Sequence, residues 1–224
     1  MGPKRTAVLI SGGGSNLQAL LDAPEMAAEI VLVVSNRPNA FGLERARRKG
    51  VPAELVDHQG FASREAFEER LDDLLRDAGI ELVCLAGFMR VLTPGFVEAW
   101  HDRLLNIHPS LLPAFPGLHT HARALAAGCQ VHGCTVHLVR PTLDDGPILV
   151  QGIVPVLPDD DAASLAARVL EIEHRCYPIA LDLVAQGDIT IDGGRVRGPA
   201  GRPRYVLHER LAAATSAEID DGTI

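Results

Sequence analysis

The chain has 224 residues, of which 47% are hydrophobic and 4% aromatic, so aliphatic side chains and alanine must build the core. That length suits one large α/β domain or two small ones. The formal charge of −8 argues against a general nucleic-acid-binding protein, which would present a basic surface, but it permits an anionic small molecule at a locally positive site. No apolar run approaches the ~18 residues of a membrane span, and no signal-peptide core is present. We therefore expect a cytoplasmic protein without membrane or nucleic-acid partners.

Patterning in the first half of the chain predicts strands that alternate with helices. In chain order these are strand 6–10, helix 16–22, strand 30–34, helix 40–49, strand 53–56, helix 63–78, strand 80–86, helix 94–101 and strand 104–107. Ser63 suits an N-cap, and Gly50 and Gly79 suit helix ends. Such alternation indicates a parallel sheet that is covered on both faces.

The rhythm changes after residue 108. Here the predicted elements are helix 119–127, an antiparallel pair of strands at 134–139 and 148–154, helix 162–176 and a short hairpin of strands 189–191 and 195–197. We expect Pro178 to kink the long helix or to begin a new one that runs to Gln186. The predicted class is α/β, with a Rossmann-like, mostly parallel sheet, helices on both faces and an antiparallel C-terminal portion. Residues 1–198 would form one domain, and 199–224 a peripheral or partly disordered tail.

The cysteines and histidines do not form a recognisable metal-binding pattern. Four cysteines without a C-x-x-C pair are typical of reduced, cytosolic thiols: Cys84, Cys129, Cys134 and Cys176. Four nearby histidines lie outside any H-E-x-x-H frame: His119, His121, His132 and His137. We therefore expect no metal.

A glycine-rich loop follows the first strand and opens a helix. Its residues are Gly12, Gly13, Gly14, Ser15 and Asn16. Glycines allow close approach of the backbone, and free N–H groups at a helix start attract a phosphate. A dinucleotide loop would have another glycine where Leu17 stands, and an acid where the second strand ends in Ser35-Asn36. The pattern favours a single phosphate over NAD, with a flexible turn as the plain alternative.

Two more loops follow the ends of predicted parallel strands, at 87–92 and 106–110. In the first, apolar side chains could wall a flat heterocycle and Arg90 could pair with a carboxylate, although a solvated arginine at a strand end is the commoner case. In the second, Asn106 and His108 could donate to a developing oxyanion, with Asp144 orienting the imidazole. A hydrogen-bonded core histidine and ordinary turn chemistry at Asp144 remain the alternatives. Ligands of open α/β sheets bind at this edge, which favours a site.

An ordered set of motifs resembles the phosphoribosylglycinamide formyltransferase family. The matching stretches are ISGGGSNLQAL (10–20), SNRPNAFGLERAR (35–47), LAGFMRVL (85–92), LLNIHPSLLPAFPGLHTH (104–121), VHLV (136–139), LDDGPIL (143–149) and EHRCYP (173–178). The resemblance covers roughly residues 6–197. It implies the formyltransferase fold and catalytic roles for Asn106, His108 and Asp144. Two departures are Gly13, where the family usually has Asn or Thr, and Asp145, where relatives often have Gly or Thr.

The resemblance also implies two substrates, glycinamide ribonucleotide and 10-formyltetrahydrofolate as co-substrate, bound by a monomer or homodimer. The glycine loop would hold the phosphate, and Glu173 would engage the amine, although an acid in mid-helix usually faces water. Arg64, by itself a solvated helix charge, would contact the folate. The other implied folate contacts are Met89, Arg90, Val91 and Leu92, with Arg140, Pro141, Thr142 and Leu143 closing over the pteridine.

The expected reaction is direct attack of the amine on the formyl carbon, in de novo purine synthesis. Asn106 and a protonated His108 would stabilise the oxyanion, without a covalent intermediate, because Ser110 lacks a G-x-S-x-G elbow. One alternative is a formyltetrahydrofolate hydrolase, whose relatives usually carry an N-terminal regulatory domain for which we expect no room here. Formyl transfer to Met-tRNA would need a further C-terminal domain and a basic surface. A non-catalytic nucleotide-sensing module would bind ligand without turnover.

Overall fold

The computed structural model describes residues 2–199 and 204–211. The strands are β1 (Lys4–Ile10), β2 (Ala28–Ser35), β3 (Ala53–Leu55), β4 (Leu82–Leu85), β5 (Leu104–His108), β6 (Val131–Leu138), β7 (Ile148–Pro155), β8 (Thr190–Asp192), β9 (Arg195–Arg197) and β10 (Tyr205–Leu207). The helices are α1 (Ser15–Asp22), α2 (Phe41–Arg48), α3 (Arg64–Asp77), α4 (Pro94–Ala99), α5 (Thr120–Ala126) and α6 (Ala162–Gln186), with a 3₁₀ turn, η1 (His58–Gly60).

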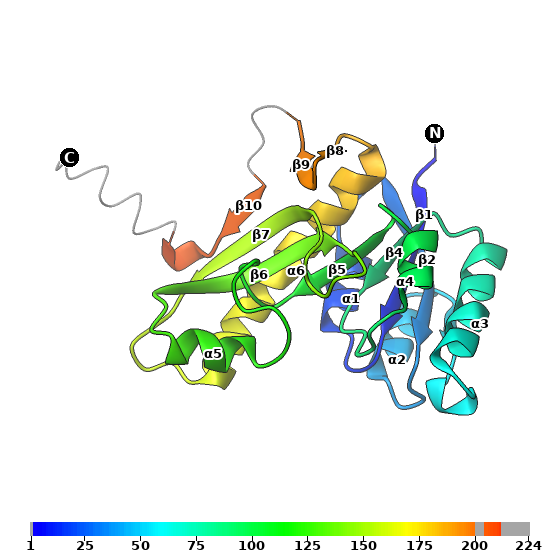
Figure 1. Cartoon of the computed structure of the whole chain (residues 1–224), viewed down its shortest axis with the longest axis horizontal. Helices are drawn as coiled ribbons and strands as arrows, with labels where there is room; N and C mark the ends of the chain where they lie inside the picture. The colour runs from blue at the N-terminus through cyan, green and yellow to red at the C-terminus, as the bar shows by residue number, and fades with distance from the viewer. Residues whose placement is uncertain (1, 200–203, 212–224) are drawn as a thin grey trace.

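The main sheet has the strand order β10-β7-β6-β5-β4-β1-β2-β3 within the described residues, beside a separate β8–β9 hairpin (Figure 1). Neighbours from β5 to β3 pair in parallel, whereas β6 is antiparallel to both β5 and β7. The predicted class, a mostly parallel α/β sheet with an antiparallel C-terminal portion, is confirmed. The carboxyl ends of β1, β4 and β5 therefore lie side by side.

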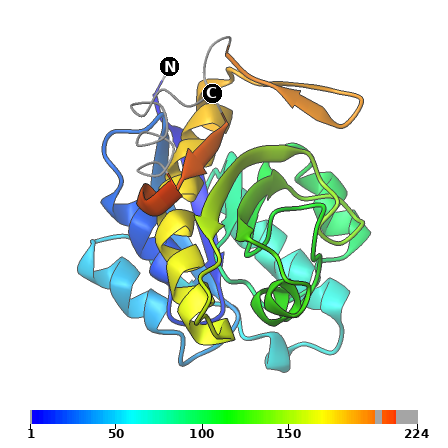
Figure 2. The ribbon, with the colours of Figure 1, turned by 90° about the vertical axis from the view of Figure 1, so that its left-hand side faces the viewer.

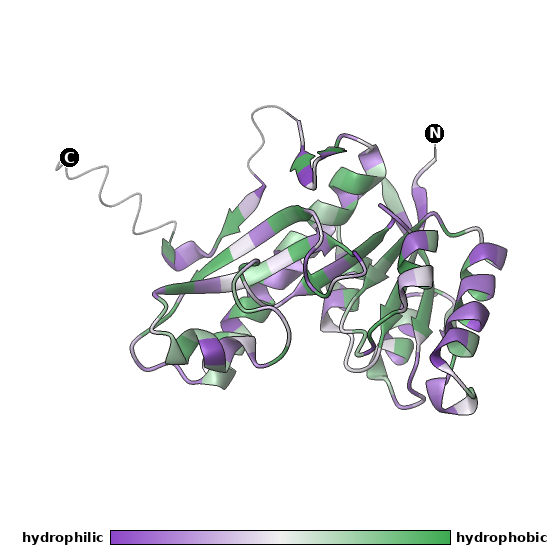
Figure 3. Cartoon of the chain, viewed as in Figure 1, coloured by the Kyte–Doolittle hydropathy of each residue, from purple (hydrophilic) through white to green (hydrophobic). Residues whose placement is uncertain are grey.

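Two apolar clusters cover the two faces of the sheet. Along β1, Val8 and Ile10 belong to the cluster that includes α1, α2 and α6, while Ala7 and Leu9 belong to the cluster that includes α3 and α4. Figure 2 shows α6 running alongside α1 and the β6–β7 pair. Hydrophobic residues concentrate on the strands and hydrophilic ones on the outward side of α3 (Figure 3). Successive residues of β1 thus face opposite clusters, so the strand is buried on both faces of the sheet. This packing fixes the position of the loops that follow the strands.

Local sequence explains the helix boundaries. The Ser63 hydroxyl accepts a hydrogen bond from the Ala66 N–H at 3.1 Å, which confirms the predicted N-cap of α3. Asp161 and Ser164 form a capping box at the start of α6. Contrary to one of the two expected outcomes, α6 does not restart at Pro178 but continues as a single helix to Gln186. Buried side chains on both sides of Pro178 pack against the sheet, and this packing outweighs the lost backbone hydrogen bond.

The C-terminal tail adds a strand to the sheet. β10 pairs in parallel with β7 at the outer edge, and the Arg204 guanidinium donates to the carbonyls of Ile148 and Leu149 at 2.7 and 3.1 Å (Figure 1). The sequence showed no pattern for this strand. The proposed boundary at residue 198 stays a prediction, and the parts of the expected tail at 200–203 and 212–224 lie outside the described residues.

Tyr177 ties α6 to the ends of two strands beneath the site. Its side chain is fully buried, and its hydroxyl donates to the carbonyls of Leu85 at 2.9 Å and Leu105 at 3.3 Å. Burial raises the pKa of Tyr177 well above its ordinary value, so the hydroxyl is a donor at neutral pH.

Replacing Tyr177 with Phe should lower the free energy of unfolding by about 1–3 kcal/mol, because two buried carbonyls lose a donor. Urea denaturation measures the change. The exposed Tyr205 provides the matched control, and Tyr205→Phe should leave stability unchanged. Equal stability of Tyr177→Phe and the wild type would contradict the role given to this hydroxyl.

Candidate active site

Three loops meet at the carboxyl edge of the parallel strands. The Ser11 N–H, directly after β1, donates to the Gly87 carbonyl, directly after β4, at 3.1 Å. The buried Ser11 hydroxyl donates to Asn36 Oδ1 at 2.6 Å and accepts from the Met89 N–H at 2.8 Å. The glycine loop and the 87–92 loop are therefore hydrogen-bonded to each other, as expected for one shared site.

The structure brings His108 and Asp144 together, with Asn106 beside them. Asn106 and His108 lie two residues apart on β5 and so share one face of the sheet. The His108 Nδ1 lies 3.5 Å from Asp144 Oδ2, and the two side chains are 8% and 6% exposed. A carboxylate this close to a buried imidazole fixes the orientation of the ring.

Asp144 reaches His108 because the hairpin between β6 and β7 folds back tightly. Gly146 allows this, since a Cβ there would lie 1.6 Å from the Leu138 carbonyl oxygen. Asp144 itself adopts a left-handed backbone conformation, with φ of 54°. Its Oδ2 also accepts the Gly117 N–H at 2.8 Å, so the carboxylate contacts both His108 on β5 and the segment around Gly117.

His137 is a site residue that the sequence did not predict in this role. It lies opposite Asn106 in the β5–β6 register. Its Nδ1 is 3.1 Å from the Leu138 carbonyl, which can only accept, so Nδ1 carries the proton. Burial lowers the pKa of His137, and the neutral ring can accept the Asn106 amide N–H at Nε2, 3.2 Å away. This bond orients the amide and leaves its second N–H for a ligand. Only the strand register reveals the pair.

Phe115 is a second residue that sequence reasoning missed. Its backbone carbonyl lies 3.1 Å from His108 Nε2, so Nε2–H is the donor to it. The ring is therefore turned with Nδ1 toward Asp144. A proton on Nδ1 would create an imidazolium that is able to donate to a negatively charged oxygen, with its charge balanced by the carboxylate.

The glycine loop has the geometry of an anion cradle. Gly14 precedes α1 with φ of 70°, and a Cβ on it would lie 2.8 Å from the Gly42 Cα, so the position requires glycine. No atom crowds Gly12 or Gly13. The Arg45 guanidinium donates to the Gly13 carbonyl at 2.8 Å, which adds positive charge beside the free N–H groups. An acidic chain thus has a locally positive loop.

Glu173 does not face water, as a mid-helix acid usually does. Because α6 packs against α1, the side chain is buried and its Oε2 accepts the Asn16 amide at 2.7 Å. Burial raises the pKa of Glu173 to about 7, partly offset by that hydrogen bond. The carboxyl group therefore changes charge close to neutral pH.

The residues expected to contact a folate occupy varied positions. Met89 and Val91 are 65% and 59% exposed, whereas Leu92 is buried. The Arg90 guanidinium lies 5.2 Å from the centre of the Phe67 ring, and Arg64 is exposed at the first turn of α3. In the 140–143 segment, Pro141, Thr142 and Leu143 are exposed. Arg140 instead directs its guanidinium to Asp102 and to the Val139 carbonyl. The exposed apolar side chains suit a flat, partly apolar ligand.

Histidines also pack behind the site. The rings of His121 and His132 meet edge to face with centroids 5.4 Å apart, and burial lowers the pKa of both, that of His132 to about 4. Across the described ranges, no group of three or more His, Cys, Asp or Glu side chains is arranged to hold a metal ion. The four cysteines are free thiols. Within the same ranges no helix has the length and apolar character needed to cross a bilayer.

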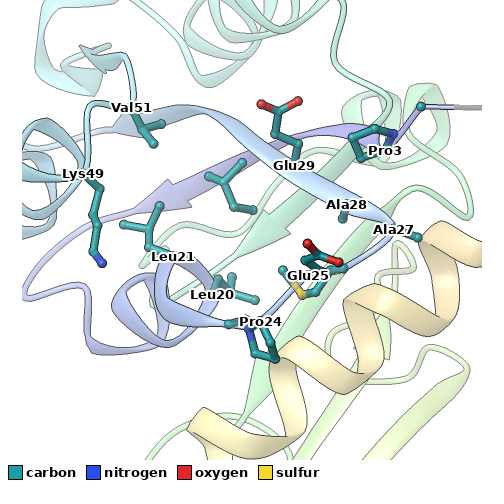
Figure 4. A pocket seen from close by; sticks show the side chains of 14 residues that line it. Pro3, Leu20, Leu21, Pro24, Glu25, Ala27, Ala28, Glu29, Lys49 and Val51 are labelled. Atoms are coloured by element: carbon teal, nitrogen blue, oxygen red, sulfur yellow. The ribbon is translucent and has the colours of Figure 1, made fainter.

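Two surface cavities lie away from the trio of Asn106, His108 and Asp144. One of about 620 Å³ sits near the end of α1 and the start of β2, with Glu25, Glu29 and Lys49 around it (Figure 4). Another of about 770 Å³ runs between α1 and α6, with Arg45 and His174 in its lining. The first lies at the amino end of β2 and so on the opposite edge of the sheet from the converging loops.

Comparison with known proteins decides the family. Residues 4–181 match the family model described as Formyl transferase. The chain belongs to the formyl transferase family. Phosphoribosylglycinamide formyltransferase of Escherichia coli (strain K12) is 46% identical over 183 residues, which cover 80% of this chain and 86% of that protein. Trifunctional purine biosynthetic protein adenosine-3 of Drosophila melanogaster is 51% identical over 193 residues, or 84% of this chain, but the chain spans only 14% of that protein's length.

The solved structures agree with this formyl transferase assignment. The crystal structure of phosphoribosylglycinamide formyltransferase from Anaplasma phagocytophilum superposes with a TM-score of 0.86 at 42% identity, covering 92% of this chain and 100% of that one. The resemblance inferred from the motifs is confirmed, and so is the fold expected from it. The roles of individual residues remain predictions.

Glu173→Gln tests the buried carboxyl group. The folded protein binds a proton at Glu173 more tightly than the unfolded chain, so wild-type stability falls as the pH rises from 4.5 to about 7. Gln cannot titrate and can still accept from Asn16. The variant should gain stability relative to the wild type across this window and keep a constant advantage above it. Urea denaturation at about pH 5 and about pH 8 measures this difference, and a difference that is independent of pH would contradict the assignment.

Proposed function

We propose that this protein transfers the formyl group of 10-formyltetrahydrofolate to the amine of glycinamide ribonucleotide, in de novo purine synthesis. The observation that carries the proposal is the convergence of His108 and Asp144, with Asn106 beside them, at the sheet edge where the glycine loop also lies. Similarity to the E. coli enzyme over most of its length supports the same reaction. The function implies small-molecule substrates and a cytoplasmic monomer or homodimer.

The proposed chemistry is addition followed by elimination at the formyl carbon. The amine attacks this carbon, and the carbonyl electron pair moves to the oxygen. The free N–H of Asn106 and the Nδ1–H of protonated His108 donate to the oxyanion, and Asp144 balances the imidazolium charge. When the tetrahedral intermediate collapses, its bond to the folate nitrogen breaks. That nitrogen takes a proton, and the former amine loses one, with a bound water as the relay. This path needs neither a metal nor a covalent enzyme intermediate.

The substrates would occupy the two hydrogen-bonded loops. Gly12, Gly13, Gly14, Ser15 and Asn16 would hold the ribonucleotide phosphate, with Glu173 near the amine end. The folate would lie along Met89, Val91 and the 140–143 segment, with Arg64 and Arg90 toward its carboxylates. Because the Ser11 hydroxyl joins both loops, the two substrates would be held in one fixed relation.

His108→Ala and Asp144→Asn should each lower kcat by about 10²–10³-fold, since each removes or disorients an oxyanion donor. Steady-state kinetics measures the loss, and denaturation verifies folding. His101→Ala, at an exposed histidine, is the matched control and should keep the wild-type rate. A near-normal rate in either site variant would remove that residue from the catalytic trio.

The substrate requirement separates the proposed transferase from its alternatives. Purified protein incubated with 10-formyltetrahydrofolate should release tetrahydrofolate only when glycinamide ribonucleotide is present, because the amine is the nucleophile. Release at the same rate without ribonucleotide would indicate the hydrolase, in which water attacks. Binding of both ligands with no release would indicate a non-catalytic sensor.

A further inference from the structure

The segment 115–119, here called the 115–119 loop, contacts both the histidine and the aspartate of the trio. The Phe115 carbonyl accepts from His108 Nε2 at 3.1 Å, and the Gly117 N–H donates to Asp144 Oδ2 at 2.8 Å. The orientation of the imidazole and that of the carboxylate therefore depend on where this loop lies. A shift of the loop would change both hydrogen bonds at once.

Two residues of this loop have a backbone conformation that is unfavourable for residues other than glycine. Phe115 and His119 are non-glycine residues in the left-handed region, with φ of 54° and 58°. Such conformations cost free energy and persist only where surrounding contacts hold them in place. Contacts from outside the loop are therefore needed to keep Phe115 and Gly117 on the trio.

Arg123 supplies these contacts from α5. Its Nη1 donates to the Pro116 carbonyl at 2.6 Å and to the Leu118 carbonyl at 3.3 Å. Its guanidinium carbon lies 5.5 Å from the centre of the Phe115 ring, within the range of a cation–π contact. One side chain thus contacts three residues of the loop, which lie on both sides of Gly117.

Behind Phe115, on the side away from Arg123, lie two histidine rings. The Phe115 ring packs edge to face on His132, at 5.9 Å between centroids, and His132 in turn packs on His121. Burial lowers the pKa of both histidines, so the rings behind Phe115 are neutral. The Phe115 ring is therefore held between a neutral aromatic wall and one exposed cation.

We propose that Arg123 is a positioning residue for formyl transfer, which acts on His108 and Asp144 through the 115–119 loop. The inference rests on the proposed function. Arg123 touches neither reacting atom; it keeps the Phe115 carbonyl on His108 and the Gly117 N–H on Asp144. Its side chain is exposed, so its replacement tests the loop without opening a hole in the core.

Arg123→Gln should lower kcat about five-fold and leave the KM for glycinamide ribonucleotide unchanged, because the hydrogen bonds and the ring contact of Arg123 are made to the 115–119 loop. Arg123→Lys, which keeps the charge and one donor, should recover part of the loss. Amide hydrogen exchange should become faster at Gly117 in Arg123→Gln, since its bond to Asp144 opens more often.

Arg103 provides a matched control. It is also exposed, also donates to a backbone carbonyl, that of Ala99, and also lies over an aromatic ring, that of Trp100 at 4.8 Å. Arg103→Gln should change neither kcat nor Gly117 exchange.

Wild-type kcat in Arg123→Gln, or a loss of kcat with unchanged Gly117 exchange, would overturn the proposal. If the wild type shows no ribonucleotide-dependent transfer, the proposed function fails. Even then, faster Gly117 exchange in Arg123→Gln would show that Arg123 keeps the Gly117 N–H on Asp144. Unchanged exchange would refute this.

Discussion

The antiparallel return of β6 against β5 is the constraint on which the site depends. This pairing sets His137 opposite Asn106, and the tight hairpin that follows carries Asp144 back over His108. A shift of one residue in the register would turn His137 to the other face of the sheet and leave the Asn106 amide without its acceptor. The parallel half of the sheet contributes differently, since it collects the glycine loop and the 87–92 loop at the edge where β5 ends.

Burial shifts the pKa values of several groups around the site, in a chain whose net charge is −8. Desolvation lowers the pKa values of His132 and His137 and keeps both rings neutral, and His108 is the histidine that lies beside the Asp144 carboxylate, at 3.5 Å. Burial disfavours the charged form of Glu173 as well, which for an acid raises the pKa, here to about 7. The acidic residues on the surface do not prevent an anion site, because Arg45 and free backbone N–H groups define the field at the glycine loop.

The sequence predicted the elements that depend on local patterns. Strong periodicity and a Ser63 cap identified α3, and continuous apolar runs identified the parallel strands. It did not predict β10, because three residues carry too little pattern to reveal a strand that is stabilised by pairing with β7 and by Arg204. Nor did local rules decide between a continuous helix and a new one at Pro178, since the packing that keeps α6 continuous comes from residues distant in the chain.

The sequence by itself determined the fold class, the three loops at one edge and the residues Asn106, His108 and Asp144 as candidates, since these follow from patterning and ordered motifs. Only the tertiary structure decided how those residues are oriented. His137 and Phe115 orient Asn106 and His108 through one strand register and one backbone carbonyl, and Arg123 holds the loop that carries the latter. Such contacts depend on distances between segments that are remote in the chain, and a linear pattern of residue types does not contain those distances.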